Sequence, residues 1–359
     1  MKILLLTKIN LNAARKYHYS VHDYIKDEYF FDGWNEGFKF HGFKTYLDWR
    51  VSCIISSRFS IKYPFLFKIL RYLMRKSGLN KIDRFLLSKS IAKYCSEKSI
   101  NVIFTEINDL ISPRIIKQNY SNIKIVQWFG VFPDMLSTDT LSICKEYDKL
   151  IGPCQFSESI SVHESLSNYH YFGCLVNQRF FYHEYADDCS YDIVFVGGVK
   201  KSHSDRIKLL ELIAEKYEKF AFFGYGIEQT SKDSLLRKKF KGYADVHKVR
   251  KLYSSSKIAL NLTLNDYSRI VKGHNIRLFE IASCCGAVQI APFDMKVLDY
   301  FENDSEIVLF KDEAQLLSKL DFILSSSDSY RKNLVKKANK RSNNYSFKQQ
   351  ASRILDVIG

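Results

Sequence analysis

Long apolar runs are missing from this sequence of 359 residues. A membrane-spanning helix needs about 18 consecutive apolar residues, and no segment approaches that length. The start, Met1 to Leu6, carries one lysine and a short apolar run that leads straight into polar sequence, unlike a secretory signal peptide. We therefore expect a cytoplasmic protein, bound peripherally at the inner face of the cytoplasmic membrane, with no transmembrane helix.

Cysteine pairs are missing as well. The eight cysteines are scattered and none forms a C-x-x-C pair, so neither a disulfide framework nor a cysteine-based metal site is expected. Isolated thiols of this kind are typical of buried positions in a reducing compartment. We expect no structural metal and no bound cofactor.

Acidic residues are scarce in one part of the chain. The formal net charge is +15. The segment 58–93 contains ten Lys or Arg and a single acid, Asp83, and therefore supplies +9 of that charge. A basic segment this dense indicates an anionic partner such as a membrane surface, a phosphorylated lipid or a nucleic acid.

Apolar residues are plentiful, at 46% of the chain, and they recur in the pattern that is typical of parallel sheets. Apolar strands separated by helical stretches predict βαβ units. In the first half we expect strands at 2–7, 45–48, 101–106, 124–129 and 149–153, and a helix at 82–97. In the second half we expect strands at 191–198, 220–226, 257–263, 287–290 and 306–310, and helices at 205–217 and 345–358.

These elements predict an α/β protein with two Rossmann-like domains that face each other across a cleft. The first domain would span 1–178 and include the basic amphipathic segment 58–93. The second would span 190–340, after a polar connector. The terminal helix, 345–359, would pack back toward the first domain.

The segment from Lys272 to Gly286, KGHNIRLFEIASCCG, is the most informative motif. Its glycine and Asn275 precede a predicted helix whose first turns place Arg277 and Glu280 on one face. A helix N-terminus after a glycine loop presents free N–H groups to a phosphate, and nearby cations strengthen that binding. The alternative is a packed amphipathic helix with Arg277 and Glu280 as an ordinary surface pair.

The order of motifs in the second half resembles the spore-maturation CgeB-like family of group 1 (GT-B) glycosyltransferases. The resemblance rests on YDIVFVGG (191–198), KLYSSSKIALNLT (251–263), NIRLFEIASCCG (275–286), EIVLF (306–310) and YSF (345–347), and it covers roughly 147–359. It implies metal-independent transfer of a sugar from a nucleotide-sugar donor to an acceptor hydroxyl. The donor is then a substrate, and the first domain would bind the acceptor.

The resemblance also implies roles for residues of the second domain. Glu280 matches the glutamate that grips the nucleotide ribose, and Arg206 would contact phosphate or sugar. The remaining donor-binding residues would lie at the diphosphate: Gly197, Gly198, Lys272, Gly273, His274, Asn275 and Arg277. Two departures stand out. Lys272 occupies a place where many group 1 enzymes carry a second glutamate, and Gly198 a place where they often carry arginine, so Lys200, Lys201 or Lys272 would balance the diphosphate charge.

A catalytic base is needed only if the reaction inverts the anomeric centre. Carboxylates near predicted strand ends of the first domain are the candidates, namely Glu106, Asp109 and Asp134, with His18 and His22 as weaker ones. The sequence leaves inversion and retention open, as well as the identity of the sugar, the nucleotide and the acceptor, and the oligomeric state.

The basic segment narrows the class of acceptor. Between 61 and 76, Lys68, Arg71 and Arg75 form one stripe of a predicted amphipathic helix that is otherwise largely apolar, as in helices that lie on anionic membranes. This favours a lipid-linked or surface polysaccharide acceptor, such as a bacterial lipopolysaccharide, over nucleic acid. A packed helix in the core is the alternative. At the level of function, the alternatives are a phage-type transferase acting on DNA bases and a non-catalytic nucleotide-sugar-binding subunit.

Overall fold

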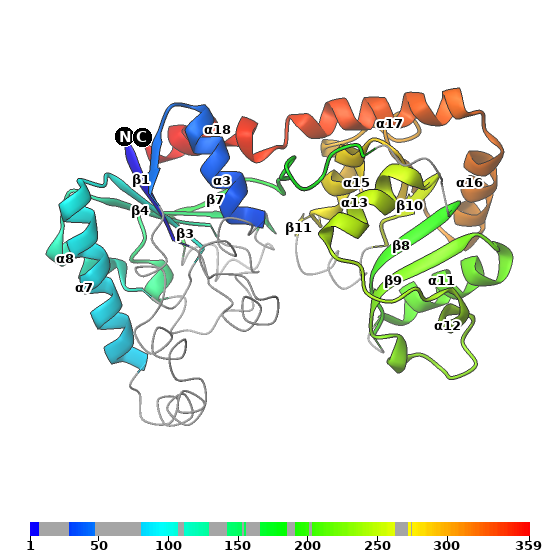
Figure 1. The fold of residues 1–359 in the computed structure, drawn as a ribbon, viewed down its shortest axis with the longest axis horizontal. Helices are drawn as coiled ribbons and strands as arrows, with labels where there is room; N and C mark the ends of the chain where they lie inside the picture. The colour runs from blue at the N-terminus through cyan, green and yellow to red at the C-terminus, as the bar shows by residue number, and fades with distance from the viewer. Residues whose placement is uncertain are drawn as a thin grey trace. The chain divides into compact units, whose positions relative to one another are not determined.

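The protein folds into two compact units (Figure 1). The computed structural model describes residues 1–6, 29–46, 80–106, 111–128, 142–152, 154–155, 166–184, 191–200, 203–262, 272–273 and 275–359. The first unit comprises Met1–Gly173 and Phe347–Gly359, and the second comprises Cys174–Ser346. Within these ranges, no helix has both the length and the apolar character needed to cross a bilayer.

The first unit is built on a six-stranded parallel sheet. Its order is β2-β1-β3-β4-β5-β7. The strands are β1 (Lys2–Leu6), β2 (Lys44–Tyr46), β3 (Val102–Thr105), β4 (Lys124–Trp128), β5 (Lys149–Gly152) and β7 (Tyr169–Tyr171), and β6 (Cys154–Gln155) lies outside this sheet. Helices cover both faces of a parallel sheet, so its central strands are buried on both sides. This explains why the central strands β1, β3 and β4 are mostly apolar.

Alternate residues of these strands face two different layers. Leu4, Ile103 and Ile125 share a buried cluster with the inner side of α7 (Asn80–Lys98), which packs against α8 (Pro113–Asn119). Pro113 occupies the first turn of α8, where its missing N–H costs nothing, and the Ser112 hydroxyl caps the Ile115 N–H. Helix α7 confirms the helix predicted at 82–97.

An aromatic cluster fills the other face. Trp34 of α3 (Tyr29–Phe40) packs within 5.0 Å of Phe104 and 5.2 Å of Trp128, measured between ring centroids. Phe347, at the start of α18 (Phe347–Ile358), meets Trp34 edge-on at 4.8 Å. Gly33 has no side chain because a Cβ there would lie 2.5 Å from the Phe347 ring. The last helix of the chain is therefore part of the first unit's core.

The second unit is built on a five-stranded parallel sheet. Its order is β13-β12-β10-β8-β9. The strands are β8 (Ile193–Gly198), β9 (Phe220–Tyr225), β10 (Ile258–Leu260), β12 (Val288–Pro292) and β13 (Val308–Phe310), and the two-residue β11 (Lys272–Gly273) lies outside the sheet. The chain runs from β8 outward to β9 and then returns to β10 on the opposite side of β8. This reversal creates a topological switch point between β8 and β10, where ligands of open α/β sheets bind at the carboxyl ends of the strands.

Helices cover both faces of this second sheet. Ile193 and Phe195 share a core with α11 (Ser204–Lys216), α16 (Glu313–Ser325) and the buried side of α17 (Asp328–Asn343). The other face carries α13 (Val246–Ser255) and α15 (Arg277–Cys284), which contact each other. The shorter elements are η3 (Ile227–Gln229), α12 (Leu235–Lys239) and η4 (Val297–Asp299).

The observed elements confirm the predicted strands and the predicted helix at 205–217, with ends that differ by a few residues. The terminal helix begins at Phe347 and not at Tyr345. The helices without a counterpart among the predicted elements are α3, α8, α12, α13, α16 and α17. The basic stripe of Lys68, Arg71 and Arg75 lies outside the described residues, so its helix stays a prediction.

Candidate active site

The carboxyl ends of β8, β9 and β10 place several polar and glycine residues around the switch point of the second unit. β8 ends in Gly197 and Gly198. Neither glycine has room for a side chain, because a Cβ on Gly197 would lie 2.8 Å from the Phe195 ring and one on Gly198 would lie 2.6 Å from the Tyr225 ring. The backbone at the end of β8 is thus bare of side chains of its own.

Arg206 holds the end of this strand. Its Nη1 donates to the Gly198 carbonyl oxygen at 2.7 Å and lies 3.3 Å from His203 Nδ1. The guanidinium also sits over the Phe195 ring, with 5.7 Å between Cζ and the ring centroid. Arg206 is therefore a bracing residue for the glycine turn in this structure.

Asn275 links the N-terminal side of α15 to the sheet. Its Nδ2 donates to Oδ1 of Asn261, directly after β10, at 2.9 Å. Its own Oδ1 is buried without a hydrogen-bond partner among the described residues. The helix begins at Arg277, and Ile276 occupies the cap position without a side-chain cap bond. The sequence placed Asn275 at the helix start, and the structure uses it instead to join α15 to β10.

Glu280 is the most perturbed carboxyl of this site. Burial raises its pKa to about 7, and the nearby Arg277 charge opposes that shift without cancelling it. The same two charges act on the buried Tyr253 hydroxyl of α13, whose pKa is raised chiefly by burial. Arg277 and Glu280 are consequently not a solvated surface pair. A carboxyl that is desolvated and charge-coupled at a switch point is a functional-site candidate.

A second set of contacts fixes the helices behind this site. The buried Arg250 of α13 donates from Nε to Glu184 at 2.6 Å, and its guanidinium lies 4.3 Å from the Tyr182 ring centroid. The carboxyl end of α15 is held by Asn339 of α17, whose Nδ2 donates to the carbonyls of Ala282 at 3.2 Å and Ser283 at 3.0 Å. These bonds fix the direction of α15 and with it the position of Glu280.

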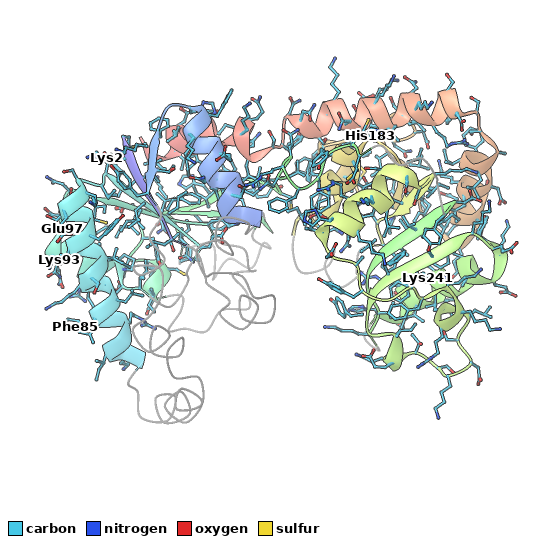
Figure 2. The ribbon with its side chains drawn as sticks, in the orientation of Figure 1. Lys2, Phe85, Lys93, Glu97, His183 and Lys241 are labelled. Atoms are coloured by element: carbon cyan, nitrogen blue, oxygen red, sulfur yellow. The ribbon has the colours of Figure 1, made fainter. Side chains whose placement is uncertain are left out.

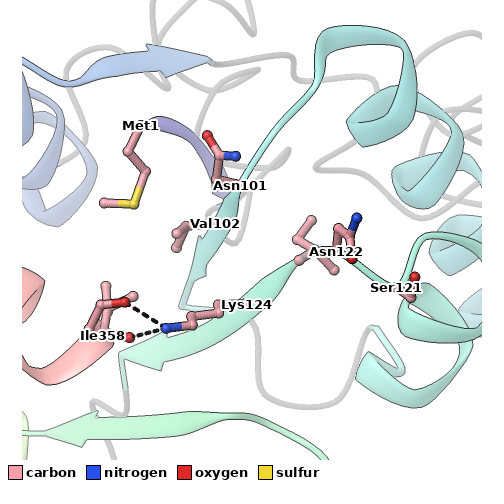
Figure 3. Close-up of a pocket in the computed structure, with 9 residues that line it drawn as sticks. Met1, Asn101, Val102, Ser121, Asn122, Lys124 and Ile358 are labelled. Atoms are coloured by element: carbon pink, nitrogen blue, oxygen red, sulfur yellow. Dashed lines mark hydrogen bonds between the residues drawn. The ribbon is translucent and has the colours of Figure 1, made fainter.

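A pocket in the first unit lies away from these residues and carries no such chemistry. Its volume is about 660 Å³, and it opens at the amino ends of β1, β3 and β4 in the first unit, opposite to the edge where α/β sheets bind ligands. Lys124 Nζ donates there to the carbonyls of Ile358 and Gly359, each at 2.6 Å (Figure 3). Lys124 therefore serves the end of α18.

Comparison with known proteins agrees with this geometry. Residues 206–356 match a family model described as glycosyl transferase-like. HepE of Anabaena, solved with UDP and glucose, has a TM-score of 0.58 at 10% identity, with 99% of each chain covered. The chain has the GT-B glycosyltransferase fold.

Two further GT-B structures extend the comparison. A glycosyltransferase of Rickettsia africae gives a TM-score of 0.58 at 11% identity, covering 99% of this chain and 97% of that one. S. aureus TarM gives 0.52 at 14% identity, covering 77% of this chain, and this chain spans only 59% of TarM. No curated protein sequence matches the chain. The predicted GT-B fold class is confirmed, whereas the assignment to the CgeB-like family stays a prediction.

The structure brings together only some of the residues predicted for the GT-B donor site. Gly197, Gly198 and Arg206 meet at the end of β8, and Asn275, Arg277 and Glu280 belong to the segment of α15. Lys272 and Gly273 form β11, but their side chains and the whole of His274 lie outside the described residues, as does Lys201. Within the described ranges, no three His, Cys, Asp or Glu side chains gather as metal ligands.

The base candidates of the first unit are described only in part. Glu106 directly follows β3, at the carboxyl edge of that sheet, and its backbone N–H donates to the Leu6 carbonyl at 3.0 Å. Asp109, Asp134, His18 and His22 lie outside the described residues. Their assignment as bases stays a prediction.

Sequence reasoning missed the residues that support the site from behind. Tyr253 lies within the motif KLYSSSKIALNLT (251–263) and Arg250 directly precedes it, but the sequence assigned no role to either residue and predicted no helix there. Asn261 carried a weak signal, since it is the first polar residue after the apolar strand β10 and thus sits at the carboxyl edge. Polar residues in that position are typical of sites at a switch point.

Proposed function

We propose that this protein is a glycosyltransferase that moves a sugar from a nucleoside-diphosphate sugar to an acceptor hydroxyl, with the donor held by the second unit. The observation that carries the proposal is the partly buried Glu280 carboxyl, whose pKa is raised by desolvation beside Arg277, at the switch point of a GT-B domain. Glu280 would accept hydrogen bonds from the ribose hydroxyls. The bare backbone of Gly197 and Gly198 would admit the diphosphate.

The other residues near the donor would stabilise the charge that develops on the leaving nucleotide. As the sugar leaves, negative charge grows on the β-phosphate of the nucleotide. Arg277, Lys272 and the N-terminus of α15 would stabilise that charge, and fixed cations and dipoles of this kind supply the largest share of many rate enhancements. In other transferases a divalent metal ion stabilises this charge. Because Arg277, Lys272 and the helix N-terminus would stabilise it here, we propose a metal-independent reaction.

The acceptor would be activated by the first unit. If the anomeric centre inverts, Glu106, Asp109 or Asp134 would take the proton of the acceptor hydroxyl, and if it is retained no base is needed. Glu106 is the candidate that the structure describes, and it follows β3 at the carboxyl edge of its sheet. Loss of transfer but not of nucleotide binding in a Glu106→Gln variant would support this role.

We further propose a lipid-linked glycan as the acceptor and peripheral attachment to the cytoplasmic membrane. Helix α7 contains the end of the basic segment and exposes Phe85 near its start (Figure 2). Ile82 and Leu86 are exposed as well, and Lys89 Nζ lies 4.6 Å from the centroid of the Phe85 ring. Apolar side chains flanked by lysines suit a headgroup boundary. Charge reversal of Lys68, Arg71 and Arg75 should release the protein from anionic vesicles in a flotation assay, and unchanged flotation would refute this location.

A thermal-shift panel tests the donor site directly. UDP, GDP, ADP and their common sugar conjugates are added to the protein, and a nucleotide at 100 times its Kd should stabilise the fold by about 2.7 kcal/mol. Glu280→Gln should lose most of this shift. If no nucleotide raises the Tm of the unchanged protein, the proposed function is wrong. Transfer assays then separate an enzyme from a non-catalytic binding subunit, and a salt-dependent gel shift with DNA would favour the base-modifying alternative.

A further inference from the structure

Two tyrosines at the carboxyl edge of the second sheet are far more exposed than most aromatic residues of the chain. Tyr225, the last residue of β9, is 56% exposed, and Tyr243 is 71% exposed. Neither side chain contributes to the core, and the glycosyltransferase roles proposed above use neither. Exposed aromatic rings beside a ligand-binding edge call for a partner with an apolar face.

Backbone register places the two tyrosines at matching positions. Phe240 forms a parallel bridge with Phe222, Lys241 N–H donates to the Phe222 carbonyl at 2.9 Å, and Gly224 N–H donates to the Gly242 carbonyl at 2.9 Å. The residues that follow this pair of glycines are Tyr225 and Tyr243. The segment 240–242 therefore runs beside β9 and ends level with it, and each backbone then presents a tyrosine.

The Tyr225 ring lies directly against the proposed diphosphate loop. A methyl group built on Gly198 would fall 2.6 Å from Cε2 and Cζ of Tyr225. The backbone around the ring is fixed by close approaches, since a Cβ on Gly224 or Gly226 would lie 1.8 Å from the carbonyl oxygen of Gly197 or Val199. Both glycines also have positive φ, at +144° and +88°. The ring position is thus a consequence of the fold.

The charged neighbours of the two rings are mainly cations. Lys200 Nζ lies 5.9 Å from the centroid of Tyr225, and Lys248 Nζ lies 4.8 Å from the centroid of Phe223 in the same strand. Lys241, between the bridge and Tyr243, is exposed (Figure 2). The nearby Asp245 is engaged by the Lys248 N–H as the cap of α13. Flat aromatic rings flanked by cations match a ligand that is itself flat and anionic, which describes a nucleotide better than a neutral sugar.

We infer that Tyr225 and Tyr243 form a stacking platform for the nucleobase of the donor, with Lys200 directed at its phosphates. The inference rests on the proposed function and specifies which part of the donor this edge of the sheet recognises. Stacking on an aromatic side chain discriminates weakly among bases, because every base has a π face. The platform therefore strengthens nucleotide binding, while contacts elsewhere select the base.

Isothermal titration with ligands that have or lack a base tests the platform. The probes are the tightest binder among UDP, GDP and ADP, the corresponding nucleotide sugar, and inorganic pyrophosphate. Tyr225→Ala and Tyr243→Ala should each weaken nucleotide binding about 5- to 150-fold, and leave pyrophosphate binding unchanged. Tyr225→Phe keeps the ring and should bind within about 3-fold of the unchanged protein. Tyr330→Ala, an exposed tyrosine of α17, is the matched control and should change nothing.

The alternative outcomes are distinct from one another. Equal losses for the nucleotide and for pyrophosphate would mean that the substitutions disturb the glycine loop, and the platform would be refuted. Loss for the nucleotide sugar but not for the nucleotide would place the rings against the sugar and also refute it. Normal binding in both alanine variants would leave the platform without a role. If the unchanged protein binds no nucleotide, the proposed function itself is refuted, and the platform with it.

Discussion

Arg206 Nη1 donates a hydrogen bond of 2.7 Å to the carbonyl oxygen of Gly198. The bond runs from the first turn of α11 back to the last residue of β8, so it fixes the turn that joins them. Because the donor is charged, the bond is stronger than one between neutral groups. Arg206 thus has a structural task at the site irrespective of any contact with phosphate.

Replacing Arg206 with alanine should therefore weaken the empty protein. We expect a loss of about 1.5–3 kcal/mol in the free energy of unfolding, from the charged hydrogen bond. Urea denaturation without ligand measures it. Arg237, a second-unit arginine whose guanidinium also binds backbone carbonyls, at Ser231 and Thr230, offers a matched comparison away from β8. An Arg206→Ala variant as stable as the unchanged protein, yet defective in nucleotide binding, would instead make Arg206 a direct phosphate contact.

Gly224 should not tolerate a side chain. Its φ is +144°, and a Cβ would lie 1.8 Å from the Gly197 carbonyl oxygen, a backbone atom that cannot move without shifting β8. We expect Gly224→Ala to destabilise the protein by about 3 kcal/mol or more, from backbone strain and overpacking together. Gly242 is the control, because it also has positive φ but nothing within 4 Å, and its alanine variant should lose only about 1 kcal/mol. Equal losses at both positions, measured by thermal unfolding, would contradict the close approach.

Glu280 should make stability fall as the pH rises. Its pKa is about 7 in the folded protein and 4.5 without the fold, so the folded state holds more protons between these values. Stability is then highest below pH 4.5 as far as this group is concerned, and declines up to pH 7 by at most about 3 kcal/mol. Glu280→Gln should lack this decline. A constant difference between the two proteins from pH 4.5 to 8, in urea titrations, would contradict the raised pKa of this carboxyl.

Nucleotide binding should show the opposite dependence on pH. Ribose hydroxyls donate to the ionised carboxylate, and burial keeps Glu280 protonated below about pH 7. The Kd should rise up to about tenfold for each pH unit below 7 in the unchanged protein. Nucleotide phosphates also titrate in this range, so the ratio of Kd values for the unchanged protein and Glu280→Gln is the quantity to compare. A ratio that does not vary with pH would remove Glu280 from the ribose.

The ion pair between Arg250 and Glu184 should support the site from behind. Arg250 is buried, and hydrogen bonding to it holds the pKa of Glu184 below its usual value. Since Glu184 is ionised in the folded state, its contribution is present above the ordinary pKa of a glutamate and is lost as the pH falls further. Glu184→Ala leaves a buried guanidinium without its carboxylate and should cost about 2–4 kcal/mol near neutral pH. Lys251→Ala removes only the exposed partner, 3.5 Å from Glu184, and should cost less than about 1 kcal/mol.

The strands at the centre of each sheet were predictable, because sequences as apolar as theirs are rarely found in exposed segments. KILLL in β1 and IVFVGG in β8 are too apolar for an exposed position, and β8 ends in two glycines. Helix α3 escaped prediction, since its twelve residues hold two glycines that disfavour helices in isolation. Those glycines are explained by α18, more than 300 residues away in sequence, because a Cβ on Gly33 or Gly37 would meet Phe347. Local propensity could not anticipate this packing.

The sequence by itself determined the order of strands and helices, the motif at α15 and the excess of positive charge, since each depends on residues close together in the chain. Only the tertiary structure decided how those residues act. It joined Asn275 to Asn261, desolvated Glu280 and laid Tyr225 over Gly198. These are contacts between separate strands and helices, and burial is a property of all the neighbours at once, so the fold alone sets the electrostatics of the site.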